Sequence, residues 1–260
     1  MINHLLTSTQ MASFIAHGYL RFDNIVPLSL CKMCLKEIPQ FNGYLSVGMP
    51  FEETWPKDTA LGEIFRIPVL KGLIWSLVGP NPLYDHHGPH LTNAGELKGP
   101  DTHQDSVTDF RENYFDIQLS FFFEDTPNEK GGTFFIPGTQ FRNVRTSEID
   151  IYQHMRGKIS VICTAGTVFV WNSRVWHGAR SNRTKSPRCM YKLRLNPSQP
   201  QIGLFNTSDL NNPAVENILK TKHGWEDTDY IYELLKRFKL WYYVSGQEES
   251  SIKSKGASGI

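Results

Sequence analysis

The 260-residue sequence lacks a charge imbalance, a long hydrophobic run and a rich supply of cysteine. Lys and Arg total 27 against 26 Asp and Glu, so no basic field can neutralise a phosphate backbone, and nucleic acid is not expected as a partner. No stretch approaches the roughly 20 apolar residues of a membrane span, and the N-terminus lacks the basic start and apolar run of a secretory signal. We therefore expect a soluble, cytoplasmic protein with no membrane partner.

Four cysteines, at positions 31, 34, 163 and 189, are too few for a disulfide framework in a chain of this size, so reduced thiols are expected. Cys31 and Cys34 form a C-x-x-C pattern, but a structural zinc site needs four ligands and no second pair completes it. The run from Leu28 to Ile38 has the composition of a helix, in which residues three apart share a face. We favour core packing of these two small thiols over metal or redox chemistry.

Internal repeats and a Pro/Gly/Ser-rich linker in the middle of the chain are also absent. All-β sandwiches and barrels of this length are commonly single units, so we predict one domain over residues 1–245. The tail over residues 246–260 consists mainly of Ser, Glu, Lys and Gly with almost nothing to bury, and it is predicted to be disordered.

The N-terminal third begins with helical signals. The Thr7–Gln10 run has the spacing of a capping box, and a helix is predicted from there to Gly18. A short strand follows over Tyr19–Phe22, and Pro27 is typical of the first turn of a second helix. Residues from about 40 to 100 are rich in Gly and Pro, and we expect loops with short elements there.

Short β-type runs separated by turn signals occupy the chain from Tyr114 to about Asn196. The runs are Asp116–Phe121, Gly132–Ile136, Thr167–Trp171 and Arg188–Leu195. Such a meander predicts a mainly β fold, with a jelly roll core over about residues 100–200 and flanking N-terminal and C-terminal helices.

Beyond Pro213 the pattern turns helical. Apolar residues recur at helical spacing at Ile231, Leu234, Leu235, Phe238 and Tyr242, with basic residues between them. We expect this helix to pack its apolar stripe on the β core.

A His-x-Asp pattern, His103 and Asp105, is the most informative motif. Residues two apart on an extended strand point to the same face, so both side chains can bind one ion. His177 follows a β run and can supply a third ligand. Two imidazoles and one carboxylate on one face of an octahedral Fe(II) leave three positions open for a bidentate oxo acid and O2. His-x-Asp alone is common, so a structural histidine is the alternative.

A candidate anchor for the oxo acid lies eleven residues after His177. Arg188, on the next apparent strand, offers a planar fork of donors that stays charged when buried and suits the far carboxylate of 2-oxoglutarate. Asn182 and Ser181, in the intervening turn, either orient the oxo acid or serve the turn itself.

These segments together resemble the phytanoyl-CoA dioxygenase family of Fe(II)/2-oxoglutarate-dependent oxygenases, over roughly residues 100–196 with a weaker N-terminal echo. The matching motifs are His103-Gln-Asp105, Asn128–Thr139, Ala165–Trp171, and His177 through Asn182 to Arg188. The resemblance implies a double-stranded β-helix, with iron on His103, Asp105 and His177 and the oxo acid on Arg188. Gln140 stands where the family usually has His, which affects nothing catalytic.

Further side chains are candidates for the cavity. Gln118 and Ser120 alternate on one face of a predicted strand, where they contact either the oxo acid or buried polar neighbours. Phe121, Phe123 and Trp171 are candidates for the apolar wall that contacts substrate and excludes water.

The segment Asp85-His-His-Gly-Pro-His90 resembles a second metal cluster, but its Gly and Pro predict a loop and no carboxylate pattern completes a site. We interpret it as a loop near the substrate entrance, with His90 as a candidate substrate contact.

The resulting hypothesis is a dioxygenase that uses Fe(II), 2-oxoglutarate and O2 to hydroxylate an unactivated C–H bond of a small molecule, releasing succinate and CO2. Because Asp105 is an acid, a halide cannot readily replace its carboxylate, and hydroxylation is favoured over halogenation. No basic cluster marks a nucleotide diphosphate, so a natural-product tailoring step is favoured over a fatty acyl-CoA substrate.

Other functions stay open. With the same cofactors, the reaction could be desaturation, epimerisation or cyclisation. A cupin-like metal protein that ignores 2-oxoglutarate and a non-catalytic binding protein are the alternatives from other classes.

Overall fold

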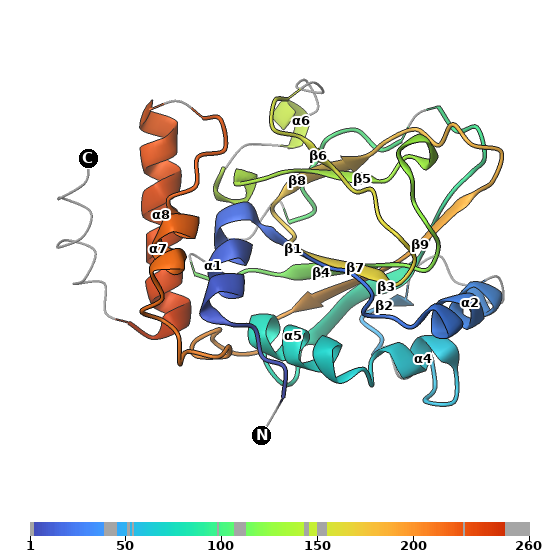
Figure 1. Ribbon diagram of the computed structural model, residues 1–260, viewed down its shortest axis with the longest axis horizontal. Helices are drawn as coiled ribbons and strands as arrows, with labels where there is room; N and C mark the ends of the chain where they lie inside the picture. The colour runs from blue at the N-terminus through green and yellow to red at the C-terminus, as the bar shows by residue number, and fades with distance from the viewer. Residues whose placement is uncertain are drawn as a thin grey trace.

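Two antiparallel β-sheets face each other, and helices cover the outer face of the larger one (Figure 1). This computed structural model describes residues 3–38, 46–50, 53, 55–97, 99–106, 113–142, 146–149, 155–225 and 227–247. Most of the tail predicted to be disordered, residues 248–260, lies outside these ranges. No helix in them is long and apolar enough to cross a bilayer.

The larger sheet has six strands and the smaller has three, all paired antiparallel. In spatial order the larger sheet is β1 (Tyr19–Phe22), β7 (Thr167–Asn172), β4 (Ile117–Phe122), β9 (Arg188–Asn196), β3 (Leu83–Thr92) and β2 (Ser46–Val47). The smaller sheet is β6 (Ile159–Ser160), β5 (Thr133–Ile136) and β8 (Trp176–Ala179). This is the double-stranded β-helix that the strand pattern predicted.

The region between residues 40 and 100 is more regular than its composition suggested. It contains α4 (Ala60–Ile64), α5 (Pro68–Val78) and the ten-residue strand β3. The prediction of a loop over Asp85–His90 is therefore wrong, because this segment lies within β3 and pairs with β9. The β core accordingly extends well before residue 100.

The predicted N-terminal elements are confirmed. Helix α1 (Ser8–His17) begins with a capping box in which Thr7 and Gln10 exchange side chain to backbone hydrogen bonds of 3.0 and 3.2 Å. It ends at Gly18, whose positive φ of 81° favours glycine. Further helices in the described ranges are α2 (Leu28–Glu37), α6 (Thr146–Ile149), α7 (Pro213–Leu219), α8 (Asp227–Ser245) and the short 3-10 turns η2 (Asn128–Lys130) and η3 (Thr139–Phe141).

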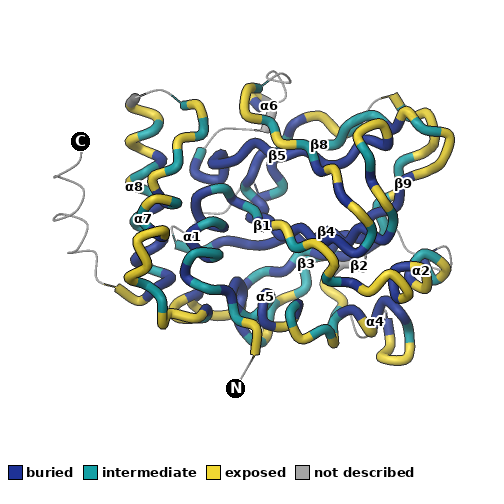
Figure 2. The backbone as a smooth tube through the Cα atoms, in the orientation of Figure 1, coloured by how far each residue is buried: buried dark blue, intermediate teal, exposed yellow. Residues whose placement is uncertain are grey.

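The central strands are buried on both faces (Figure 2). On β4, Leu119 and Phe121 belong to the core beneath the helices, whereas Phe122 packs between the sheets. Phe121 contacts the ring of Phe65 at a centroid distance of 5.8 Å, and Phe123 belongs to the same helix-side core. Placing Phe121 and Phe123 in the cavity wall was therefore wrong.

Helix α8 packs on α1 and α7, but its first turns do not bury the predicted stripe. Ile231 and Leu235 are 38% and 51% exposed, whereas Glu233 and Arg237 are 2% and 0% exposed. Arg237 pairs with Glu233. Because the ion pair occupies the inner face there, the helix is rotated from the orientation that apolar periodicity predicted. Farther along α8, Tyr242 of the predicted stripe is buried, together with Leu240, Trp241 and Val244.

A histidine pair extends this ionic cluster to the first helix. His223 lies 3.2 Å from Glu233, between Nδ1 and Oε1, and its Nε2 lies 2.9 Å from Nδ1 of His17. Burial, followed by the nearby His223 and Arg237, lowers the pKa of His17 to about 4. Helices α1 and α8 are thus joined by a partly buried polar network.

All four cysteines are buried and none forms a disulfide. Cys31 and Cys34 lie in α2 and pack in the helix-side core, as predicted.

Candidate metal centre

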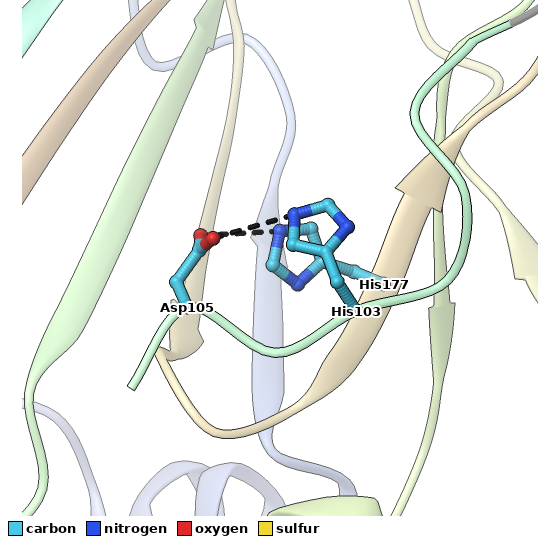
Figure 3. Close-up of side chains that lie close together, drawn as sticks. All are labelled: His103, Asp105 and His177. Carbon is cyan, nitrogen blue, oxygen red and sulfur yellow. Dashed lines mark ion pairs between the residues drawn. The ribbon is translucent and has the colours of Figure 1, made fainter. Parts of the chain in front are cut away.

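Three side chains of the predicted constellation meet between the two sheets. The ligand atoms offered by His103, Asp105 and His177 all lie within 4.8 Å of one another. Nε2 of His103 is 3.3 Å from Oδ1 of Asp105, and Nε2 of His177 is 3.2 Å from Oδ2 (Figure 3). Adjacent ligand atoms of an octahedral ion, each about 2.1 Å from it, are about 3.0 Å apart, so this spacing fits one metal ion.

Backbone pairing brings the two histidines together. His103 and His177 each donate an N–H to the other's carbonyl at 2.8 Å, which places their rings 4.4 Å apart. His177 lies on β8, but residues 101–106 belong to no named strand and are fixed by this isolated bridge. Asp105 N–H donates to Ser173 O at 3.0 Å, which turns the carboxylate toward both rings. The His-x-Asp segment thus reaches the site as an ordered loop rather than a strand.

The tautomer of each ring follows from its other nitrogen. Nδ1 of His103 donates to Asp101 O at 2.7 Å, and Nδ1 of His177 donates to Val175 O at 2.9 Å. A carbonyl can only accept, so Nδ1 bears a proton in both rings. Each Nε2 is the nitrogen that faces Asp105, where it shares a proton with the carboxylate unless a metal ion takes the place of that proton. Such backbone contacts are typical of metal-binding histidines.

Asp105 is held as an anion. Burial opposes its ionisation, but the hydrogen bonds with His103 and His177 and the charge of Lys192 outweigh burial and hold the pKa of Asp105 well below its usual range. Burial lowers the pKa of His177. Burial also acts on His103, but its hydrogen bonds with Asp105 and Asp101 outweigh burial and raise its pKa.

Arg188 begins β9 and lines the same cavity as the two histidines. It is 3% exposed, and its Nη2 donates to Thr92 Oγ1 at 2.7 Å. Its Nε and Nη1 have no hydrogen-bond partner among the described residues. A buried guanidinium with spare donors beside this candidate metal-binding constellation is suited to a carboxylate.

The other predicted cavity residues divide into two groups. Trp171 and His90 line the cavity, the latter from β3. Gln118 donates from Nε2 to Asp105 Oδ2, so it orients the carboxylate. Ser120 shares its face of β4, and its buried hydroxyl has no hydrogen-bond partner among the described residues.

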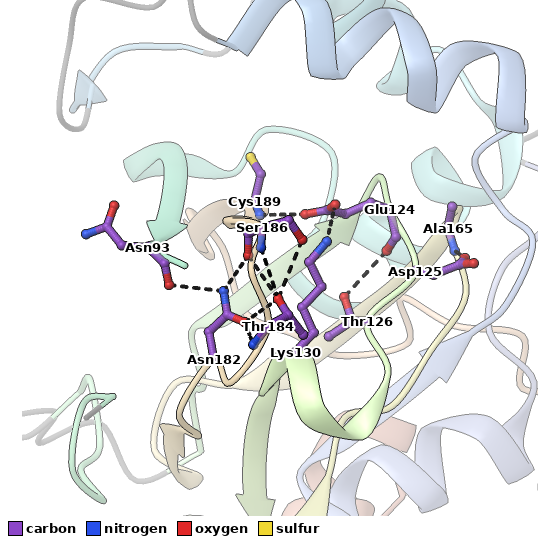
Figure 4. Close-up of polar contacts among 10 residues, drawn as sticks. All are labelled: Asn93, Glu124, Asp125, Thr126, Lys130, Ala165, Asn182, Thr184, Ser186 and Cys189. Carbon is purple, nitrogen blue, oxygen red and sulfur yellow. Dashed lines mark hydrogen bonds and ion pairs between the residues drawn. The ribbon is translucent and has the colours of Figure 1, made fainter. Parts of the chain in front are cut away.

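Asn182 belongs to the turn rather than to the cavity (Figure 4). Its Nδ2 donates to Asn93 O and Ser186 O at 3.0 and 2.8 Å, and its Oδ1 accepts from Thr184. Ser181 likewise donates to Leu97 O. Because the side-chain amide of Asn182 is fully hydrogen-bonded, it does not serve as a ligand of the co-substrate in this structure. Both Asn182 and Ser181 therefore stabilise the turn, which was the alternative considered from the sequence.

Two cations near the metal constellation were missed by the sequence reasoning. Lys192 Nζ lies 2.9 Å from Asp105 Oδ2, and Arg194 donates to the Asp105 carbonyl at 3.3 Å. Both share the inner face of β9 with Arg188 because side chains alternate along a strand. That period of two, counted from Arg188, was the available signal.

The cavity beside the constellation has a volume of about 250 Å³. Its walls come from both sheets and from the loop before His103: His90, Leu91, Thr92, Glu96, Pro100, His103, Thr133, Trp171, His177, Gly178, Ala179, Arg188, Met190 and Lys192.

Comparison with known proteins gives one family and a set of similar folds. The sequence profile described as Phytanoyl-CoA dioxygenase (PhyH) matches residues 52–190. No curated protein sequence matches the chain significantly.

Three solved structures illustrate the shared fold. HygX from Streptomyces hygroscopicus with nickel and 2-oxoglutarate bound is 13% identical with a TM-score of 0.59, covering 75% of this chain and 88% of its own. EctD from S. alaskensis with 2-oxoglutarate and 5-hydroxyectoine is 17% identical with a TM-score of 0.58, covering 76% and 78%. The non-heme alpha-ketoglutarate-dependent carbocyclase SnoK from nogalamycin biosynthesis is 14% identical with a TM-score of 0.56, covering 75% and 87%.

Proposed function

Because this chain belongs to the phytanoyl-CoA dioxygenase family of Fe(II)/2-oxoglutarate-dependent oxygenases, we propose that it oxidises a small organic molecule with Fe(II), 2-oxoglutarate and O2. In this proposal His103, Asp105 and His177 hold the iron and Arg188 holds the co-substrate. The expected outcome is hydroxylation of an unactivated C–H bond.

One observation supports the metal proposal above all. The Nε2 atoms of His103 and His177 face the two oxygens of the Asp105 carboxylate, at 3.3 and 3.2 Å respectively. Four acceptors gathered in this way repel one another unless a cation or protons lie between them. Two imidazoles and one carboxylate match the ligand set of non-haem Fe(II) oxygenases, which leaves open positions on the ion.

The bound iron would supply O2 activation coupled to the oxidative decarboxylation of 2-oxoglutarate to succinate and CO2. The chain's own residues position and shield the reactants. Gln118 and Lys192 fix one oxygen of Asp105, and Arg188 offers two buried donors to the remote carboxylate of the oxo acid. Trp171 packs 5.7 Å from His177, ring to ring, and keeps water from that side of the site.

For the substrate we propose only a broad class, a small natural product. The cavity has polar and apolar walls, and the Lys and Arg side chains in its lining, Lys192 and Arg188, are assigned here to Asp105 and the oxo acid; this favours a natural-product tailoring step over a fatty acyl-CoA substrate. SnoK is a carbocyclase and the EctD structure holds 5-hydroxyectoine, so members of this fold differ in outcome. Cyclisation, epimerisation or desaturation with the same cofactors is the second candidate for this chain.

The test is anaerobic addition of Fe(II) and then 2-oxoglutarate. The expected result is a weak visible charge-transfer band that requires both additions and that is missing from His103→Ala and Asp105→Ala. Succinate release should then be measured in air across a panel of small metabolites. A band in either variant, or none in the wild type, would contradict the ligand assignment. Oxygen uptake that ignores 2-oxoglutarate would indicate a cupin-like metal enzyme instead.

A further inference from the structure

Lys192 occupies an unusual place for a lysine. It is 8% exposed, and its ammonium contacts the oxygen of Asp105 that also accepts from Gln118. The ring centre of Trp171 lies 5.8 Å from Nζ. Lys192 lines the same cavity as the two histidines and Arg188.

A lysine in this position opposes metal binding. It stabilises the Asp105 carboxylate when no metal is bound, so a metal ion must compete with an ion pair that already exists. Once the ion is bound, the ammonium and the ion contact the same carboxylate, and their like charges repel each other. Gln118 alone could orient the same oxygen through a neutral hydrogen bond. Orientation of Asp105 therefore does not explain why a charged residue stands here.

The charges of the cavity suggest what the lysine is for. A divalent ion, Lys192 and Arg188 together bring four positive charges, against one negative charge on Asp105 and one on Glu96 at the cavity wall. The excess of two positive charges is equal in size and opposite in sign to the charge of the 2-oxoglutarate dianion. By this count the cavity is neutral when metal ion and oxo acid are both absent or both present, and it carries two uncompensated charges when only one of them is bound.

We propose that Lys192 couples the two binding events: its ammonium keeps metal affinity low until the anionic co-substrate enters, and it strengthens binding of that co-substrate. The proposal rests on the proposed function, since it takes the metal ion and the oxo acid as the ligands of this site. In this proposal Lys192 is not a metal ligand. It acts only through the positive charge that it adds to the site.

The experiment measures two affinities in the wild type and in Lys192→Met, which keeps the length of the side chain without its charge. Mn²⁺ affinity without 2-oxoglutarate is read from the EPR signal of free Mn²⁺, and 2-oxoglutarate affinity for the Mn²⁺-loaded protein is read by calorimetry. We expect the variant to bind Mn²⁺ about tenfold more tightly and 2-oxoglutarate about tenfold more weakly, a tenfold change being about 1.4 kcal/mol. Lys192→Arg, which keeps the charge, should return both values toward the wild type.

The opposite signs separate coupling from damage, because a distorted site would bind both ligands more weakly. Gln118→Leu serves as the matched control for lost orientation, with weaker Mn²⁺ binding expected. Lys192→Gln replaces Lys192→Met if the latter does not fold by circular dichroism. If both affinities fall or neither changes in the neutral variant, or if Lys192→Arg behaves like it, the coupling is refuted while the proposed function stands. If wild-type protein binds no Mn²⁺, or no 2-oxoglutarate when loaded, the proposed function itself fails.

Discussion

Replacing Arg188 by Met gives a direct test of how the oxo acid is held. Arg188 is 3% exposed, and its Nη2 is occupied by Thr92, whereas Nε and Nη1 have no partner among the described residues. Removing one member of a buried, hydrogen-bonded charge pair costs about 2–5 kcal/mol of binding free energy. A loss of about 3 kcal/mol corresponds to a Kd raised roughly 150-fold.

The assay is an anaerobic titration of Fe(II)-loaded protein with 2-oxoglutarate, followed through the visible band. Arg188→Met should raise the Kd by about two orders of magnitude, whereas Arg188→Lys should give an intermediate value because it keeps the charge but loses the planar fork. Thr92→Val is the matched control, since it removes only the contact at Nη2 and should change the Kd less than tenfold. A Kd for Arg188→Met within about threefold of the wild type would refute the proposed role of this guanidinium.

Three further predictions concern the metal ligands and the helix cluster. Gln118→Leu should weaken Mn²⁺ binding about 10- to 100-fold because Asp105 loses an orienting donor; an unchanged EPR titration would contradict this. Since hydrogen bonds outweigh burial and raise the pKa of His103, protons should compete with Mn²⁺ as the pH falls from about 8 to about 6, and a flat profile would contradict it. The unfolded chain protonates His17 near pH 6.5 and the folded chain only near pH 4, so stability should be full above pH 6.5 and fall toward pH 4. Protonation of His17 should lower the free energy of unfolding, measured with urea, by about 1 to 2 kcal/mol between pH 7 and pH 5. His17→Gln should remove that part of the difference.

The site was predictable where the signal was local. His103 and Asp105 are two residues apart, and Arg188 opens a strand with a clear alternating pattern, so few alternatives had to be weighed. The alternation of side chains along β4 could also have shown which phenylalanine faces the site. Gln118 and Ser120 face the site, so the aromatic residue of the same parity is Phe122, and Phe121 must face the helices.

Other features depend on partners far away in the sequence. Gly88 and Pro89 suggest a loop, yet pairing with β9 over most of its length makes that segment a strand. The inner face of α8 contains Glu233 and Arg237, which no hydrophobic period could place, because their burial depends on each other and on His223. Long-range pairing, rather than local propensity, decides both cases.

The buried thiols affect how this protein can be labelled. Burial raises the pKa of Cys31 and Cys163 to about 11 and of Cys189 to about 12, and it raises that of Cys34 as well. Maleimides and iodoacetamides react with thiolates, so the four native cysteines should be almost inert at neutral pH while the fold is intact. One cysteine introduced on the surface could therefore take a spin label or a fluorophore without a cysteine-free background.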